Sequence, residues 1–300
     1  QKPGFEVLII TVPNKTKKEQ SVFDWIFSGK TNSNSEIPIR SYTIKEDKII
    51  YESYADGLEK EIDLFKLENT PEKYIQKRTF YFGTDKYGRD VLSRLFIGTR
   101  ISFFIGFIAV FISLFIGISI GAIAGYFGGK IDVFIMWIIN ITWSIPTLLL
   151  VIAITLALGK GYWQVFIAVG LTMWVEVARV VRGQVMSTKQ EQYIEAAKAL
   201  GFSDFRIIFK HILPNILAPV IVISAANFAA AILIESGLSF LGIGAQPPTP
   251  SWGAMIKNHY NYIIVGKAYL ALIPGTAIML LVMSFMLIGN ALRDALDVKN

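Results

Sequence analysis

The chain has 300 residues, 53% of them hydrophobic and only 17% charged, and its mean hydropathy is +0.49. Soluble domains of this length carry more polar surface, so the composition indicates a membrane protein. The absence of cysteine excludes disulfides, thiolate metal sites and cysteine nucleophiles. The net charge of +6 is spread over several connections, and we expect no nucleic-acid partner.

The charged residues divide the chain into a polar N-terminal part and an apolar remainder. Residues 1–100 hold 17 Lys and Arg and 15 Asp and Glu, whereas the rest of the chain holds 12 and 8. Short apolar runs such as residues 7–12 and the alternating stretch 37–44 predict a small strand-containing domain over residues 1–80. We interpret it as an insertion that covers the outer mouth of the protein, and docking of a partner is the alternative.

Residues 81–300 contain five apolar stretches, each long enough to cross the roughly 30 Å hydrocarbon core of a bilayer as a helix. The third is uncharged up to Val175 and continues through Glu176. The sequence therefore predicts an all-α polytopic membrane protein behind the strand-containing domain. The expected spans are residues 101–127, 133–159, 162–184, 215–240 and 268–291.

Lysine and arginine gather in the cytoplasmic loops of membrane proteins, and here they follow an alternating pattern. One set of connections carries Lys130, Arg179, Arg182, Lys189, Lys198, Arg206, Lys210, Arg293 and Lys299, whereas the other carries only Lys160, Lys257 and Lys267. The pattern predicts that residues 187–214 and the C-terminus are cytoplasmic and that residues 1–100 lie outside. A polar outer domain needs an exporting segment, so we expect a sixth membrane helix before Gln1, with a cleaved signal peptide as the alternative.

Small residues recur at every fourth position of the first span. They are Ser113, Gly117, Gly121, Gly125 and Gly129. In lipid, small side chains let two helix backbones approach closely, so this stripe is predicted to face a neighbouring helix. A glycine-lined conduction path is the alternative.

Polar residues in the second and fourth spans are candidates for a translocation path. Asn140, Thr142 and Ser144 come shortly before Pro146, which removes a backbone hydrogen bond and is expected to kink the helix. The three side chains would either line a water-filled path or bond to a neighbouring helix. Glu235 is a further candidate, because a carboxylate within a membrane is costly and is often functional.

Residues 187–214 are predicted to form a helix, a turn and a second helix. A capping box of Thr188 and Glu191 would begin the first helix. Lys198 suits its last turn, and Gly201 can adopt the left-handed conformation that follows a helix. The small side chains of this helix would let another protein come close.

The second helix of this loop would begin after Ser203 as its cap. Its expected apolar face consists of Phe205, Ile208, Phe209 and Ile212. Pro214 would end or bend the helix before the fourth span.

Several motifs resemble those of binding-protein-dependent ABC importer permeases. Glu195, Ala196 and Ala197, followed by Gly201 and by residues 212–214, are similar to the cytoplasmic loop signature of that family. Within the family, the dipeptide, oligopeptide and nickel permeases contain motifs similar to residues 83–94, 178–184, 238–253 and 292–297 of this chain. The resemblance covers about residues 80–298, and residues 1–80 and Val298 depart from it.

This resemblance implies a six-span subunit in the cytoplasmic (inner) membrane of a bacterium or archaeon. It would pair with a second homologous permease and receive substrate from an extracytoplasmic binding protein. Two ATP-binding subunits on the cytoplasmic side would drive it. The chain has no phosphate-binding loop, so ATP and Mg²⁺ are expected on those subunits, with no catalytic residue or cofactor here. No metal site is expected, because His211 and His259 are isolated.

In the resembled family the loop helix is a coupling helix that sits in a groove of the ATPase. Mapped onto this chain, the coupling residues are Glu195, Ala196, Ala197, Gly201, Lys198 and Pro214. The expected function is peptide import by alternating access, with nickel or another small solute as the alternative substrate. An ATP-independent channel or carrier is the alternative of a different class.

Overall fold

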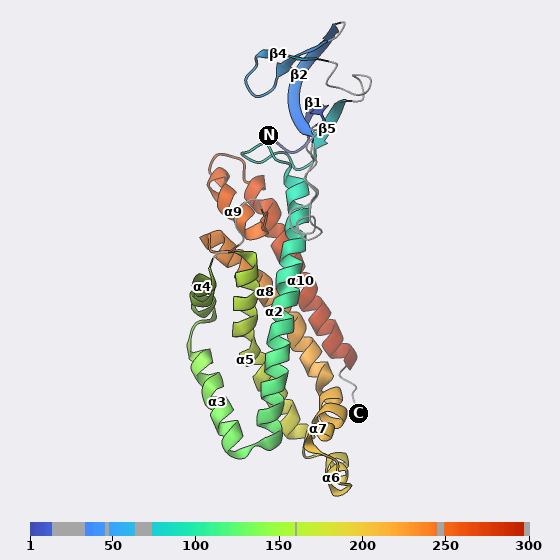
Figure 1. The fold of residues 1–300 in the computed structure, drawn as a ribbon, viewed down its shortest axis with the longest axis vertical. Coiled ribbons are helices and arrows are strands. Elements are labelled where there is room, and N and C mark those ends of the chain that lie inside the picture. Colours follow the sequence, from blue (N-terminus) through green and yellow to red (C-terminus); the bar gives the residue numbers. More distant parts are fainter. Residues whose placement is uncertain (14–33, 46–47, 64–73, 160, 245–248, 297–300) are drawn as a thin grey trace. The chain divides into compact units, whose positions relative to one another are not determined.

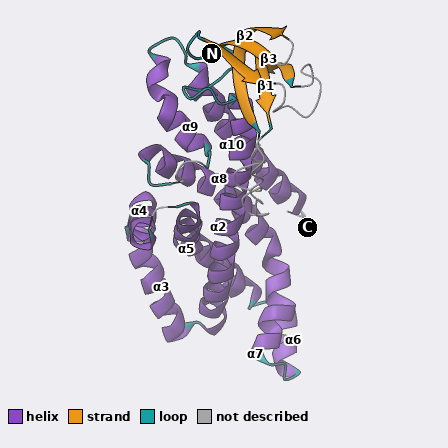
Figure 2. Cartoon of the chain, turned by 45° about the horizontal axis from the view of Figure 1, so that its top comes forward, coloured by secondary structure: helices purple, strands orange, loops and turns teal. Residues whose placement is uncertain are grey.

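The computed structural model describes residues 1–13, 34–45, 48–63, 74–159, 161–244 and 249–296 (Figure 1). Contacts divide the chain into two compact units, Gln1–Ile97 and Gly98–Asn300. Strands occur in the first unit, and the second is built from helices (Figure 2). The predicted fold class, a helical membrane protein with a small strand-containing part at its front, is confirmed.

The first unit is built on one antiparallel sheet with the strand order β4-β3-β2-β1-β5. Ile10, Ile39, Ile49 and Tyr51 form its main core, to which the three inner strands contribute. The strands are β1 (Phe5–Val12), β2 (Ser35–Lys45), β3 (Lys48–Ser53), β4 (Glu59–Asp63) and β5 (Ile75–Phe80).

Helix α2 (Val91–Phe127) contains the first predicted span but begins well before residue 101. The carboxylate of Asp90 accepts hydrogen bonds from the backbone N–H groups of Leu92 and Ser93, at 3.2 and 3.1 Å. Such a cap satisfies amides that have no partner within the helix. The helix therefore starts directly after its capping residue, Asp90, whereas hydropathy marks only its apolar part.

The remaining helical segments follow in chain order. They are α3 (Gly129–Ser144), α4 (Thr147–Leu158), α5 (Tyr162–Thr188), α6 (Gln192–Ala199), α7 (Asp204–Ile207), a π-helical segment (Ile208–Ile212), a 3₁₀ turn (Leu213–Ile216), α8 (Leu217–Leu241), α9 (Trp252–His259), a second 3₁₀ turn (Tyr260–Ile263) and α10 (Tyr269–Leu296). Among the described residues, four helical stretches are long and apolar enough to cross a membrane, and α3 with α4 makes a fifth if the pair is one span.

The predicted kink at Pro146 is a break between α3 and α4. The two helices meet at 90°. Ile145 leaves the helical region, with φ −91° and ψ 128°, because the proline ring disfavours helical geometry in the residue before it. The predicted second span is therefore two short helices, not one continuous helix.

The glycine stripe of α2 packs against α5, as predicted. A Cβ atom at Gly121 would lie 2.5 Å from the backbone oxygen of Ala178, and one at Gly125 would lie 2.7 Å from that of Arg182. Such distances leave no room for a side chain. Gly129 is an exception, because it has φ +56° and no neighbour within 4 Å of a Cβ position. The prediction was wrong for this residue, which is the first residue of α3.

Candidate functional site

The predicted loop helix is present as α6, but it begins later than the capping box suggested. Helix α5 continues to Thr188, and Glu191 precedes α6 without a side-chain cap hydrogen bond. The capping box of Thr188 and Glu191 was therefore wrong. Val181 and Val185 of α5 are fully buried in the same core as the loop, and this burial favours the extension of α5 past the predicted boundary.

The end of α6 has the predicted geometry. Gly201 has φ +76°. The backbone N–H of Phe202 donates to the oxygen of Ala197 at 3.1 Å, and that of Gly201 donates to the oxygen of Lys198 at 2.9 Å. These two bonds define a Schellman motif, in which a glycine at the left-handed position satisfies the last carbonyls of a helix.

Helix α6 presents two different faces. Ile194 and Ala197 are buried in the chain's own core, whereas Glu195, Ala196 and Lys198 are exposed. Ala197 was predicted to belong to the surface that a partner contacts, but its side chain attaches α6 to the core. The exposed face is small and charged, and its role in coupling stays a prediction.

In the segment after Gly201, the predicted helix cap is confirmed and the predicted apolar face is wrong. The Ser203 hydroxyl accepts a hydrogen bond from the Arg206 amide at 3.5 Å. Ile208 and Ile212 are buried, but Phe205 and Phe209 are 71% and 53% exposed. Residues Ile208–Ile212 are π-helical, which changes the helical period, so the four side chains do not share one face.

Pro214 neither ends the helix nor separates the loop from the fourth span. It lies within the first two residues of the 3₁₀ turn Leu213–Ile216, which continues into α8. Proline is tolerated in the first turn because its missing N–H has no helical partner there. The segment Asp204–Leu241 is consequently a nearly continuous rod that reaches from the loop into the apolar region.

Two contacts fasten the loop to the end of α2, and both are near one end of the helical unit (Figure 1). The Tyr126 hydroxyl donates to the Asp204 carboxylate at 2.6 Å. The Lys189 ammonium donates to the Tyr126 backbone oxygen at 2.5 Å. The loop is thus bonded to α2 on both sides of α6, and sequence reasoning missed Tyr126 because nothing local marks it.

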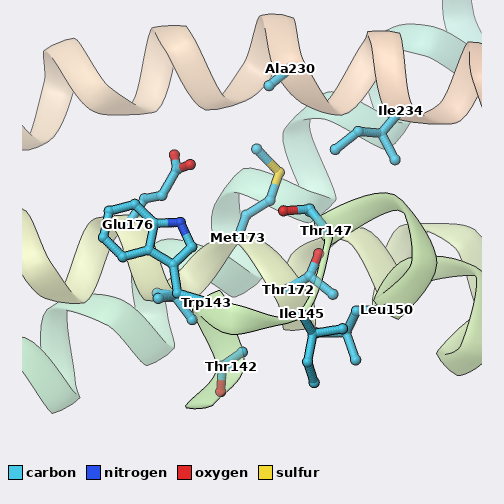
Figure 3. Close-up of a pocket in the computed structure, with 11 residues that line it drawn as sticks. Thr142, Trp143, Ile145, Thr147, Leu150, Thr172, Met173, Glu176, Ala230 and Ile234 are labelled. Atoms are coloured by element: carbon cyan, nitrogen blue, oxygen red, sulfur yellow. The ribbon is translucent and has the colours of Figure 1, made fainter. Parts of the chain in front are cut away.

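A pocket of about 230 Å³ lies where the break between α3 and α4 faces α5 and α8 (Figure 3). Thr142 lines it, which brings one residue of the predicted polar cluster to the pocket. Asn140 and Ser144 do not line it. The Asn140 side-chain oxygen accepts a bond from Arg179 at 3.2 Å, and the Ser144 hydroxyl donates to the Asn140 backbone oxygen at 2.8 Å.

Glu176 of α5 also lines this pocket. It is exposed within the chain and lies near the middle of its helix. Sequence reasoning noted it only as the charge in the third span and did not select it. An acidic residue near the middle of a predicted span is itself the signal that could have identified it.

Glu235 lies outside the pocket, although its neighbour Ile234 lines it. Its side chain is fully buried, and its carboxylate accepts a 2.6 Å hydrogen bond from the Ser239 hydroxyl. A contact of 3.5 Å with the Ser236 hydroxyl adds to this. The predicted path residues therefore separate into Thr142 at the pocket, Asn140 and Ser144 beside it, and Glu235 in the interior.

Comparison with known proteins places these features in a family context. Residues 117–299 match the sequence profile of the family described as binding-protein-dependent transport system inner membrane component. The chain is 43% identical over 234 residues to a dipeptide transport system permease protein of Alkalihalophilus pseudofirmus, and the alignment covers 77% of each chain. It is also 43% identical to an oligopeptide transport system permease protein of Escherichia coli over 73% of this chain and 72% of that one.

A solved structure has a similar fold. An inward-facing conformation of the MetNI methionine ABC transporter aligns with a TM-score of 0.58 at 19% identity. The alignment covers 68% of this chain and 97% of that one. At this identity the likeness concerns the fold of the helical unit.

Proposed function

Because the chain belongs to the family of binding-protein-dependent transport system inner membrane components, we propose that it is the permease subunit of an ATP-driven importer of peptides. The observation that carries the substrate class is the 43% identity with a dipeptide permease over 77% of this chain. The subunit is a transporter component, and ATP hydrolysis belongs to separate subunits.

The proposed assembly contains four kinds of partner. A second homologous permease completes the membrane part, and two ATP-binding subunits lie on the cytoplasmic side. An extracytoplasmic binding protein delivers the peptide, and the lipid bilayer surrounds the spans. In this arrangement residues 187–214 and the C-terminus are cytoplasmic, and residues 1–100 lie outside, in agreement with the distribution of Lys and Arg.

Helix α6 is the proposed coupling helix. Its exposed face of Glu195, Ala196 and Lys198 offers a carboxylate and a small side chain to an ATP-binding subunit. The opposite face, with Ile194 and Ala197, belongs to the core of the chain. A displacement of α6 therefore moves the core that it shares with α2, α5 and α8, and does not merely bend a free loop.

Transport then proceeds by alternating access. Closure of the two ATP-binding subunits displaces α6, and the bonds of Tyr126 with Asp204 and Lys189 pass that displacement to the end of α2. The nearly continuous helical segment Asp204–Leu241 passes it into α8. Rocking of these helices opens the path first outward and then inward.

The test compares two charge reversals, Glu195→Lys in α6 and Glu59→Lys in β4, both at exposed carboxylates. Uptake of a labelled dipeptide into cells is measured with the amount of chain in the membrane and the copurification of the ATP-binding subunits. We expect Glu195→Lys to abolish uptake and weaken copurification while insertion stays normal. Glu59→Lys should behave like the parent chain. Full uptake by the double variant Glu195→Lys and Gly201→Val would contradict the coupling role.

A further inference from the structure

The pocket at the break between α3 and α4 contains a carboxylate without a countercharge. Glu176 forms no ion pair with the described residues. The nearest cation along its helix, Arg179, is engaged elsewhere: its guanidinium carbon lies 3.4 Å from the centroid of the Trp143 ring, and it donates to Asn140. Because Glu176 is exposed within the chain, its carboxylate is accessible to a cationic guest in the pocket.

The rest of the lining adds hydrogen-bond acceptors and an aromatic ring. Glu176 and Trp143 lie toward one end of the pocket, and Thr147 and Thr172 lie toward the other (Figure 3). The Thr172 hydroxyl donates to the Val169 backbone oxygen at 2.8 Å, and this use of its hydrogen leaves its oxygen free to accept. A carboxylate and hydroxyl oxygens together match a compact group with a positive charge and several N–H donors.

The size and chemistry of the pocket further restrict which molecules can bind there. Its volume of about 230 Å³ is below that of pockets that enclose a whole drug-sized ligand, roughly 300–1,000 Å³. It therefore suits one end of a longer molecule. A divalent metal ion does not fit, because such ions need several oxygen ligands and the described residues contain no cluster of three His, Asp or Glu.

We propose that the Glu176 pocket receives the N-terminal ammonium group of a peptide while the peptide crosses the membrane. This inference rests on the proposed peptide function and names the part of the substrate that this chain recognises. The carboxylate neutralises the ammonium at its end of the pocket, and the hydroxyl oxygens of Thr147 and Thr172, toward the other end, offer acceptors for the N–H of the first peptide bond. The apolar residues Met173 and Ile234 contact the first side chain of the peptide.

The absence of cysteine makes a direct test possible, because one introduced thiol reports on the charge around it. The reporter is Leu150→Cys, in the pocket, and the matched control is Ser144→Cys, which is exposed but outside the lining. Each is studied in the assembled transporter in proteoliposomes. The rate of labelling by 2-aminoethyl methanethiosulfonate, a cation, is divided by the rate for the sulfonatoethyl reagent, an anion. The same assembly with the cysteine-free parent chain gives the background labelling of the partner subunits.

We expect the reporter in the pocket to favour the cationic reagent by about tenfold, as is typical of a cleft with one sign of charge. Glu176→Gln should remove most of this preference and Glu176→Asp should retain it, whereas the control reporter should respond to neither. A dipeptide with a free amino group should slow labelling, and its N-acetyl analogue should not.

Two results would overturn the ammonium site. One is a labelling ratio that Glu176→Gln leaves unchanged, and the other is equal protection of the reporter by the dipeptide and its N-acetyl analogue. Failure of the proposed function gives a different result: the parent transporter then takes up no dipeptide at all, and no dipeptide protects the reporter, while the preference for the cationic reagent persists.

Discussion

The Tyr126 hydroxyl donates a 2.6 Å hydrogen bond to the Asp204 carboxylate, which joins the last turn of α2 to the first turn of α7. The two residues are 78 positions apart in the chain. Lys189 adds a second bond to the same turn of α2. Helix α6 lies between Lys189 and Asp204 in sequence, so it is held at both of its ends, and a force on α6 has a direct mechanical route to α2.

Tyr126→Phe and Asp204→Asn should each lower dipeptide uptake and the thermal stability of the solubilised chain. A hydrogen bond to a charged group contributes about 1.5–3 kcal/mol. The double variant should be no worse than Tyr126→Phe alone, because that change already removes the bond that Asp204→Asn weakens by loss of the charge. Tyr260→Phe is the control, since no hydrogen bond of its hydroxyl is found among the described residues. Additive losses in the double variant would show that the two residues act independently.

Sequence reasoning identified the features that depend on local chemistry. The apolar stretches located the membrane helices, and the spacing of Gly117, Gly121 and Gly125 predicted the close contact with a neighbouring helix. The left-handed Gly201 and the cap at Ser203 were also predictable, because each depends on a few adjacent residues. These features need no knowledge of distant parts of the chain.

The errors and omissions concern features that tertiary packing determines. The π-helical turn at Ile208–Ile212 rotates the predicted apolar face, so Phe205 and Phe209 are exposed. Ala197 is buried because α6 packs on the core of the chain. The pocket around Glu176 exists only because the break at Pro146 faces α5 and α8, and the proline predicts a kink but not what the kink encloses.

Gly121→Ala should destabilise the helical unit. Its new Cβ would lie 2.5 Å from the backbone oxygen of Ala178, so α2 and α5 must move apart. Overpacking of this kind typically costs about 1–3 kcal/mol. Gly183→Ala is the matched control, because it also lies in a helix and has nothing within 4 Å of its Cβ position. The midpoint of thermal unfolding in detergent measures both, and an equal shift for the two variants would refute the close packing.

The effects of substitutions at Gly201 on uptake should follow the backbone preference of the new residue and not the size of its side chain. The residue has φ +76°, and its Cβ position has no neighbour within 4 Å, so a steric clash plays no part. Asparagine tolerates the left-handed region, whereas alanine there costs about 1 kcal/mol or more and a β-branched residue costs further. Uptake should therefore fall in the order Gly, Asn, Ala, Val. A variant series ranked by volume, with Ala better than Asn, would contradict this explanation.

Single cysteines can establish the orientation of the chain, because the parent sequence contains none. Ile264 is 91% exposed between α9 and α10, and Ala199 is exposed at the end of α6. The distribution of positive charges predicts that the first connection lies outside and the second in the cytoplasm. A membrane-impermeant maleimide should thus label Ile264→Cys in intact cells and Ala199→Cys only after the membrane is opened, with Lys60→Cys in β4 behaving like Ile264→Cys. Labelling of Ala199→Cys in intact cells would place α6 outside, where no ATP-binding subunit can reach it.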